Sequence, residues 1–267
     1  MRTTMSAMSA GLALAALATT ARAQTRDQAR IAFTIMGGYV LPRELWSVER
    51  QPVFDAPLPS DTFSLGRRIR PTVSFGFSGI YFPSDHLGWV GEAYLIGLGF
   101  EDRCNLVYAS GSSRNRQVCQ SIDQGEKAAT AVALNGGVVY RVASRAPISP
   151  YVRAAAGVLF TTQSSVRMVG QFPSNSTGEL ADVTIYPDDH DSRVSPTAVL
   201  ALGFTSAVGH GYQIRWEIRD NVAAVRAVTG ATLEDGTPTP TATRIKHLLS
   251  LNVGFDVVLE RRRGRRY

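Results

Sequence analysis

The chain of 267 residues lacks most features of helical membrane proteins and of common enzymes. It contains only two cysteines, helical periodicity is scarce, and no Gly-x-Ser-x-Gly motif occurs. After the first 23 residues, no apolar run approaches the roughly 20 residues that a transmembrane helix needs. No Pro- or Ser-rich linker divides the rest, so residues 24–267 form one large all-β domain or two small ones.

The first residues have the pattern of a secretion signal. Arg2 gives a positive start, residues 10–18 form a short apolar core, and Ala21-Arg22-Ala23 matches the small-x-small cleavage pattern. We therefore expect a signal peptide over residues 1–23. The alternative is an uncleaved anchor helix, for which the apolar run is short. No Cys follows that run, which argues against lipoprotein acylation.

The formal net charge of +6 does not describe the body of the protein. Two arginines lie in the signal and five in the tail of residues 261–267. Without these seven, 21 basic residues stand against 22 acidic ones. We expect no nucleic-acid partner for an exported protein. The tail is predicted to be a solvated periplasmic end, with contact to anionic lipid headgroups as the alternative.

Alternation of apolar and polar residues is the strongest signal, and it is clearest in Tyr212-Gln-Ile-Arg-Trp-Glu-Ile-Arg219. Successive side chains of a strand point to opposite faces, so this strand is apolar on one face and ionic on the other. Weaker forms recur, and they predict an all-β fold: an eight-stranded antiparallel up-and-down transmembrane β-barrel over residues 24–260. The predicted strands are residues 31–41, 71–82, 87–100, 129–142, 150–162, 195–207, 212–222 and 244–260.

The connections between these strands alternate between long and short. Long outer loops that alternate with tight periplasmic turns are typical of bacterial outer-membrane barrels, and an even strand count puts both termini in the periplasm. The short connections centre on residues 83–86, 144–149 and 209–211, and the long ones are residues 42–70, 101–128, 163–194 and 223–243.

Aromatic residues gather at the strand ends beside the short turns, which favours an interfacial girdle over simple β-propensity. Segment 87–100 is less clear, because it is apolar on both parities. If Glu92 points inward, so do Tyr94, Ile96 and Leu98, and either an apolar upper lumen or a bulge would explain the segment. The predicted girdle residues are Tyr81, Phe82, Trp89, Tyr140, Tyr151 and Tyr212.

The inward parity carries a set of charged residues. Eight-stranded barrels of this kind are filled by side chains, and buried charges must be paired. We expect a plug of salt bridges with Glu217 as a central node held by more than one arginine; a gate or a conduit for small solutes is the alternative. The predicted lumen network is Glu92, Arg141, Arg153, Arg215, Glu217, Arg219 and Asp256.

Cys104 and Cys119 both lie in the second long connection, and an exported protein meets an oxidising compartment. A disulfide is therefore expected, with two free thiols as the alternative. It would close a loop of about 15 residues and contribute roughly 3 kcal/mol in the chain-entropy model. No His lies near either cysteine, so a metal site is not expected there.

In signal, strand number and loop alternation, the mature chain resembles the small outer-membrane β-barrel superfamily that contains the OmpA barrel domain, OmpX and OmpW. That family usually carries an assembly signal in its last strand, which reads polar-x-Gly-x-x-hydrophobic-x-hydrophobic. Aliphatic residues here replace the usual aromatics, and no peptidoglycan-binding domain follows the barrel. The resemblance implies that the corresponding residues are Asn252, Gly254, Val257 and Leu259.

Two further groups of residues could carry chemistry, an acidic segment and the histidines of the outer side. Residues 188–191, Asp-Asp-His-Asp, could bind a hard cation, but their spacing matches no known motif, and a solvated acidic loop is favoured. Some barrels of this size are lipid A deacylases or acyltransferases with a Ser, a His and a carboxylate near the outer rim. Only His190 and His247 lie on that side, and no Ser is obviously placed beside either.

The pattern therefore predicts a monomeric outer-membrane barrel with a structural or surface-interaction role, and with no cofactor, metal or catalytic residue. Its expected partners are outer-membrane lipids, lipopolysaccharide and the barrel assembly machinery. Two other functions stay open. One is a porin-like narrow pore or a carrier for small apolar solutes, and the other is a lipid A-modifying enzyme.

Overall fold

The computed structural model describes residues 30–53, 61–108, 111–144, 146–174, 179–188, 193–209, 211–232 and 238–260. The predicted signal peptide, residues 1–23, and the basic tail, residues 261–267, lie outside the described residues. No helix in these ranges is long and apolar enough to cross a membrane.

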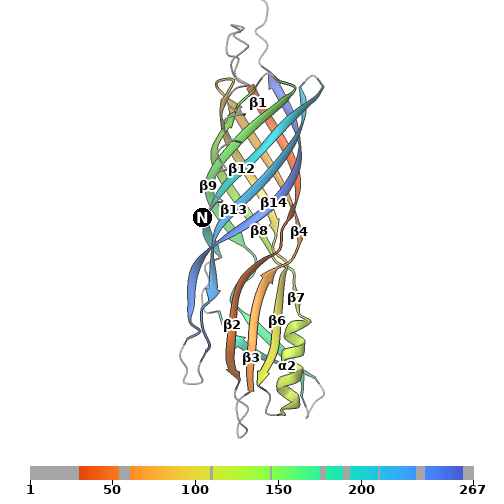
Figure 1. Cartoon of the computed structure of the whole chain (residues 1–267), viewed down its shortest axis with the longest axis vertical. Coiled ribbons are helices and arrows are strands. Elements are labelled where there is room, and N and C mark those ends of the chain that lie inside the picture. Colours follow the sequence, from red (N-terminus) through yellow and green to blue (C-terminus); the bar gives the residue numbers. More distant parts are fainter. Residues whose placement is uncertain are drawn as a thin grey trace, which may run out of the picture.

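Eight antiparallel strands form a closed barrel in which β1 pairs with both β4 and β14 (Figure 1). Consecutive barrel strands are neighbours in the ring, and the elements that the chain forms between them belong to other sheets or to a helix. The topology of the barrel is therefore up-and-down. All eight predicted strands are confirmed. They are β1 Arg30–Val40, β4 Thr72–Phe82, β5 Leu87–Gly97, β8 Thr130–Arg141, β9 Ile148–Thr161, β12 Val194–Gly209, β13 Tyr212–Val228 and β14 Thr241–Glu260.

The alternation in the sequence sorts side chains between the two surfaces of the barrel. On β13, Trp216 and Ile218 are 46% and 59% exposed, whereas Glu217 and Arg219 are 3% and 0% exposed. The other barrel strands also carry apolar side chains on the outside, whereas their inward side chains include both polar residues and apolar ones such as Met36 and Val139. A closed ring leaves no unpaired strand edge, and an apolar exterior is stable only in lipid. The fold is therefore an eight-stranded transmembrane β-barrel.

Short turns close one end of the barrel, as predicted. Gly211 has a φ of +81°, a conformation that a residue with a Cβ rarely adopts, in the turn between β12 and β13. The girdle prediction is wrong for two residues. Phe82 and Tyr151 are each 3% exposed and point into the lumen, since each shares the inward parity of its strand. Tyr81, Trp89, Tyr140 and Tyr212 lie on the exterior.

The long connections are not simple loops, which corrects the sequence interpretation. They form an outer domain at the other end of the barrel (Figure 1). One part is a four-stranded sheet in the order β2-β3-β6-β7, and another is the two-stranded sheet β10-β11. The predicted strand 87–100 ends at Gly97, and Phe100 begins β6. The elements are β2 Arg43–Val53, β3 Asp61–Ile69, β6 Phe100–Tyr108, α2 Ser113–Asp123, β7 Glu126–Lys127, β10 Met168–Pro173 and β11 Leu180–Tyr186.

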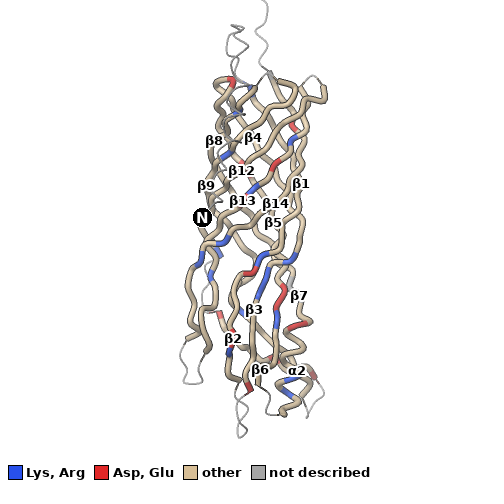
Figure 2. The backbone as a smooth tube through the Cα atoms, in the orientation of Figure 1, with Lys and Arg blue, Asp and Glu red and all other residues tan. Residues whose placement is uncertain are grey.

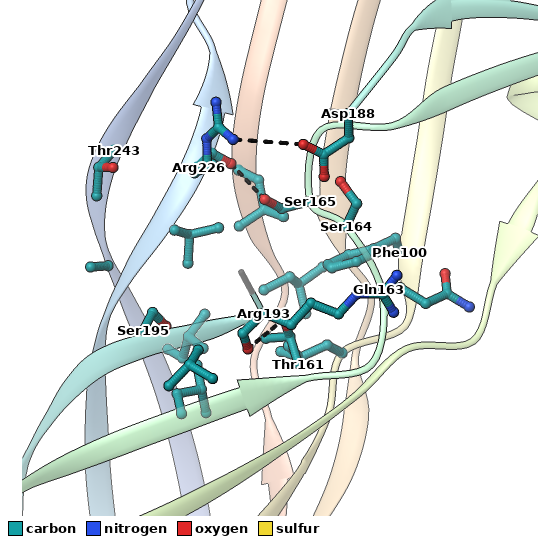
Figure 3. Close-up of a pocket in the computed structure, with 18 of the residues that line it drawn as sticks. Phe100, Thr161, Gln163, Ser164, Ser165, Asp188, Arg193, Ser195, Arg226 and Thr243 are labelled. Carbon is teal, nitrogen blue, oxygen red and sulfur yellow. Dashed lines mark hydrogen bonds and ion pairs between the residues drawn. The ribbon is translucent and has the colours of Figure 1, made fainter. Parts of the chain in front are cut away.

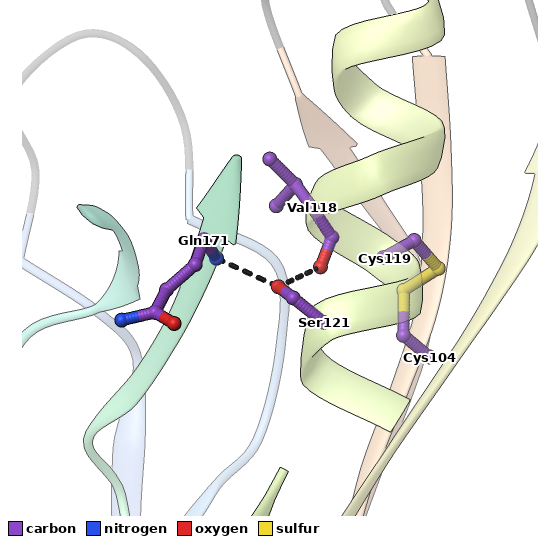
Figure 4. Close-up of a disulfide and its surroundings, with 5 residues drawn as sticks. All are labelled: Cys104, Val118, Cys119, Ser121 and Gln171. Atoms are coloured by element: carbon purple, nitrogen blue, oxygen red, sulfur yellow. Dashed lines mark hydrogen bonds between the residues drawn. A yellow bond between two sulfur atoms is a disulfide. The ribbon is translucent and has the colours of Figure 1, made fainter. Parts of the chain in front are cut away.

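Helix α2 begins at a capping residue, because Ser112 Oγ accepts a hydrogen bond from the Asn115 N–H at 3.3 Å. Its buried residues Asn115, Val118, Cys119 and Ile122 have the spacing of one helical face. The predicted disulfide between Cys104 of β6 and Cys119 is confirmed, with 5.3 Å between the two Cα atoms (Figure 4). It ties this helix to the four-stranded sheet.

A single cluster of buried apolar side chains runs from the barrel into the outer domain. It joins Met36 and Tyr94 of the barrel to Trp46 and Val118 of the outer domain. Tyr186 is buried in the same cluster, donates to Gln51 Oε1 at 3.0 Å, and has a pKa raised by burial. The outer domain and the outer half of the lumen therefore share one core.

Candidate functional site

The lumen contains a charged cluster that crosses the barrel. Glu92 projects inward from β5, Arg153 from β9, and Glu217 and Arg219 from β13. In the ring of eight strands, β5 and β13 lie on opposite sides, with three strands between them in either direction. An ion pair between these two strands therefore spans the diameter of the lumen. The charged positions on the barrel strands can be followed in Figure 2.

Glu92 is the carboxylate that joins two arginines. Its Oε1 accepts from Arg219 Nη2 at 2.5 Å and from Asn135 Nδ2 at 2.9 Å. Its Oε2 accepts from Arg219 Nη1 at 2.9 Å and lies 3.0 Å from Arg153 Nη1. The forked contact with Arg219 is the charge-assisted geometry that contributes most to such pairs. Glu92 therefore faces inward, and residues 87–97 form a regular strand. Tyr94 and Ile96 face inward beyond Glu92, so the lumen is apolar at the end near the outer domain.

Glu217 is not the central node that the sequence suggested. Its Oε1 accepts from Arg153 Nη2 at 2.8 Å, and its Oε2 accepts from the Tyr151 hydroxyl at 2.8 Å. Arg215 and Arg219 flank it along β13 but bond to Asp256 and Glu92 instead. Arg219 reaches across the lumen to β5, and Arg215 turns to the adjacent strand β14, so each of these two guanidinium groups bonds to a carboxylate of another strand.

Tyr151 reaches Glu217 because β12 leaves room for its ring. A Cβ at Gly203 would lie 2.6 Å from the Tyr151 hydroxyl oxygen and 2.2 Å from the Trp216 carbonyl oxygen. Gly76 has the same role for Tyr94, whose ring carbon would lie 2.3 Å from a Cβ there. Tyr94 then bonds Ser74 Oγ at 2.7 Å. Inward glycines thus let large aromatic rings fill a narrow lumen.

A second ion pair lies nearer to the short turns. Arg215 Nη2 donates to Asp256 Oδ2 at 2.7 Å, and Arg215 Nε donates to Asp256 Oδ1 at 3.0 Å. Arg141 is also buried, but no hydrogen bond or ion pair among the described residues joins it to a carboxylate. Its guanidinium carbon lies 3.6 Å from the centre of the Phe82 ring. Six of the seven predicted lumen charges are therefore paired, and Arg141 is stacked on an aromatic ring.

The proposed assembly-signal residues divide between the two faces of β14. Asn252 is buried in the lumen and accepts from the Tyr94 hydroxyl at 2.5 Å. A Cβ at Gly254 would lie 3.2 Å from Met36 Cβ. Leu259 is 53% exposed on the exterior, and Val257 shares its parity. Their part in assembly remains a prediction.

A cavity of about 280 Å³ lies where the barrel meets the outer domain (Figure 3). β12 pairs with β13 only as far as Thr197 opposite Ala223, whereas β13 continues to Val228 along β14. Pro196 has no N–H to donate, so β12 cannot maintain a full ladder with both neighbours at this point. The two strands part here, and the cavity lies between them.

The walls of this cavity are mainly apolar, with charges at the margin. Leu98, Leu159 and Leu248 are among the residues that line it. Asp188 and Arg226 form an ion pair at 3.6 Å, which is drawn in Figure 3. The sequence does not predict this cavity. The cavity exists because β12 stops pairing with β13 before β13 stops pairing with β14, and alternation along a strand does not show where its pairing with a neighbour ends.

The structure gives little support for a metal site or a catalytic site at residues 188–191 or at His247. His190 lies outside the described residues with Asp189 and Asp191. His247 Nδ1 lies 2.7 Å from Asp220 Oδ2 on the outward parity of the β13–β14 pair, and no serine of the described residues bonds to it. Within the same residues, no group of three His, Cys, Asp or Glu side chains is placed to hold a metal.

No protein-family model and no curated protein matches the chain. Several solved structures match at low identity. Neisserial surface protein A is 12% identical, with 86% of this chain and 97% of that one covered and a TM-score of 0.40. The outer membrane protein OprG of Pseudomonas aeruginosa is 10% identical, with coverages of 88% and 98% and a TM-score of 0.46. Ail, the attachment invasion locus protein of Yersinia pestis, is 11% identical, with coverages of 87% and 99% and a TM-score of 0.36. At such identities the likeness concerns the fold alone.

The sequence identified the charged lumen residues but not the neutral ones that complete the cluster. Tyr151, Tyr94 and Asn135 were missed as partners. Parity alone could have found Tyr151, because it is two residues from Arg153 and must face the same side. Asn135 sits opposite Glu92 in the β5–β8 register, a pairing that needs the strand alignment.

Proposed function

We propose that the protein is a non-conducting outer-membrane scaffold that holds a rigid outer domain at the cell surface for contact with macromolecules outside the cell. The observation that carries this proposal is the shared core of barrel and outer domain. Loose loops would lose much of their conformational entropy on binding, whereas a preordered surface does not. The outer domain is preordered by two sheets, a capped helix and a disulfide.

The charged cluster supports the closed-lumen half of this proposal. Glu92 and Arg219 join opposite walls, and Arg153 connects that pair to Glu217. These side chains are at most 1% exposed. Opening the lumen would separate buried charges from their partners, at a cost of several kcal/mol. We also propose that the barrel is a monomer inserted by the barrel assembly machinery and surrounded by lipid and lipopolysaccharide.

Attachment of expressing cells tests the surface role. A host without its own adhesins would carry either the wild-type chain or the Cys104→Ala/Cys119→Ala variant, at equal surface amounts. Attachment to immobilised extracellular-matrix proteins and cell-to-cell aggregation would be measured for both. We expect the wild type to attach above the level of empty cells and the variant to attach less. Attachment equal to that of empty cells would contradict the proposal.

A second candidate function is favoured by the cavity between β12 and β13. An engineered apolar cavity of about 150 Å³ is large enough for benzene, so 280 Å³ can hold a larger apolar solute. The gap between the strands offers such a solute a route through the barrel wall instead of along the closed lumen. This function is a carrier or receptor for small apolar molecules.

Transfer of naphthalene into vesicles distinguishes the two functions. The wild-type protein would be compared with Ala224→Phe, which fills the cavity, and with Leu200→Phe, a matched change on the lipid-facing exterior. A carrier predicts faster transfer with wild type and Leu200→Phe than with Ala224→Phe. Equal rates for all three proteins and for protein-free vesicles would exclude the carrier and leave the scaffold.

A further inference from the structure

The four-stranded sheet of the outer domain has one covered face and one open face. Cys104 of β6 points to the covered face, where its disulfide to Cys119 holds α2 against the sheet. Alternate residues of a strand point to opposite faces, so Arg103 and Asn105 lie on the open face, and both are exposed. On β3, the residues of the open face are Thr62, Ser64, Gly66 and Arg68.

A depression of about 160 Å³ lies in the middle of this open face. Gly66 lies at its centre, opposite Ser47 of β2 on one side and Arg103 of β6 on the other. Because Gly66 has no side chain, it leaves a gap in the layer of side chains. Pockets for drug-sized ligands measure about 300–1,000 Å³, so this depression fits a single ring-sized group. Its polar walls are Glu44, Ser47, Ser64, Arg68, Arg103 and Asn105.

Every arginine that lines the depression already has a carboxylate partner. Arg67 is paired with Asp102 at 2.5 Å on the covered side of the sheet. Glu101 accepts from Arg68 and lies 3.8 Å from Arg103 Nε. A sulfate, phosphate or carboxylate group would compete with Glu101 for these two arginines, and a cationic group would be repelled by them. The charges therefore favour an uncharged ligand.

The walls of the depression offer both donors and acceptors of hydrogen bonds. Arg68 Nε is buried and bonds to no atom of the described residues, which is unfavourable for a donor. Asn105 and the hydroxyl groups of Ser47 and Ser64 can each donate and accept, and Glu44 only accepts. A hydroxyl group of a ligand also donates and accepts, so a ring with several hydroxyl groups matches these walls. An apolar group would leave them without partners.

We infer that this depression binds one uncharged sugar unit of a glycan outside the cell. The ring lies over Gly66, where a side chain would exclude it. Its hydroxyl groups accept from Arg68 and bond to Asn105 and to the two serines. Since the outer domain is proposed above to contact macromolecules outside the cell, the site rests on that function and supplies the chemical class of the partner.

A glycan array tests the site. The full chain would be refolded in a zwitterionic detergent, because maltoside and glucoside detergents carry sugar headgroups that would compete. It would be applied to neutral glycans that end in glucose, galactose, mannose, fucose or N-acetylglucosamine, and to sialylated and sulfated glycans. We expect binding to at least one class of neutral glycan and displacement by the corresponding free monosaccharide, whose affinity would then be measured by calorimetry.

Three variants connect this binding to the depression. Gly66→Leu fills it, and the added Cβ would lie 3.5 Å from the Trp46 carbonyl oxygen, an ordinary contact that the fold tolerates. Arg68→Met keeps a long side chain but removes the donors. Each should weaken sugar binding by about tenfold or more. The control Thr62→Leu changes the same strand on the same face, outside the depression, and should bind as wild type. The gel shift and resistance to protease would verify that each variant is folded.

Several results would overturn the inference. These are the absence of binding to every neutral glycan, binding to sialylated or sulfated glycans alone, and equal binding by wild type and folded Gly66→Leu. Cells that attach as proposed above while the array shows no neutral glycan would overturn the sugar site and leave the scaffold function in place.

Discussion

Replacing Glu92 with Gln should be among the most destabilising conservative changes in the lumen. The amide keeps the size of the side chain but removes the charge that Arg153 and Arg219 share. Arg219 would lose its ionic, forked partner and would keep at most one hydrogen bond to the amide oxygen, its bond to Asn221 Oδ1 at 2.7 Å and its stacking on Tyr94. Hydrogen bonds to charged groups contribute roughly 1.5–3 kcal/mol each, and removing one member of a buried pair costs about 3–5 kcal/mol.

Glu217→Gln provides the matched comparison. Glu217 is bonded to one guanidinium, that of Arg153, and Arg153 keeps its contact with Glu92. The expected cost is therefore about half as large, roughly 1.5–3 kcal/mol. Ile218→Val on the lipid-facing exterior should cost about 1 kcal/mol or less, because it removes one methylene and leaves no charge unpaired.

The free energies of unfolding would be measured in urea from lipid vesicles, with tryptophan fluorescence as the probe. The double variant Glu92→Gln/Arg219→Gln should be less destabilised than the sum of its two single variants, because no unpaired guanidinium remains at position 219. A neutral Glu92→Gln, or a Glu217→Gln that costs more than Glu92→Gln, would refute the assignment of Glu92 as the residue that joins the two walls.

Three further outcomes follow from the fold. Cys104→Ala/Cys119→Ala should lower the stability of the outer domain by about 3 kcal/mol and speed its proteolysis, while the gel shift between boiled and unboiled protein, which reports the barrel, persists. Gly76→Val should displace the Tyr94 ring and cost about 1–3 kcal/mol in urea unfolding, whereas Gly91→Ala, where a Cβ meets nothing within 4 Å, should have little effect. In a background without the native cysteines, Asn105→Cys should react with a membrane-impermeant thiol reagent on intact cells and Pro83→Cys should not; the reverse labelling would invert the orientation.

The barrel could be predicted from the sequence because each of its strands is marked by alternation of apolar and polar residues within a short segment. Alternation along each strand fixes which side chains face lipid, as Trp216 and Glu217 illustrate. The same alternation occurs in Phe63, Leu65 and Ile69. The sequence nevertheless predicts a loop there, because long segments between the strands of such barrels are typically outer loops. Helix α2 was missed because its apolar face consists of few residues among many polar ones.

The pairing across the lumen could not be predicted in the same way. Glu92 and Arg219 are 127 residues apart, and their contact requires both the closure of the ring and the depth of each residue along its strand. Parity supplies the inward direction only. It therefore identified the members of the charged cluster and misplaced its centre at Glu217. The cavity between β12 and β13 depends on strand ends, which are the least certain part of any sequence-based assignment.

The closed lumen is the central claim, and single-channel recording tests it most directly. The refolded protein would be inserted into planar lipid bilayers, with insertion verified by protease protection, and current would be recorded under an applied voltage. The cluster of Glu92, Arg153, Glu217 and Arg219 predicts silence, because it joins opposite walls of the barrel. Stable, discrete openings of wild-type protein would contradict it and show that the lumen conducts.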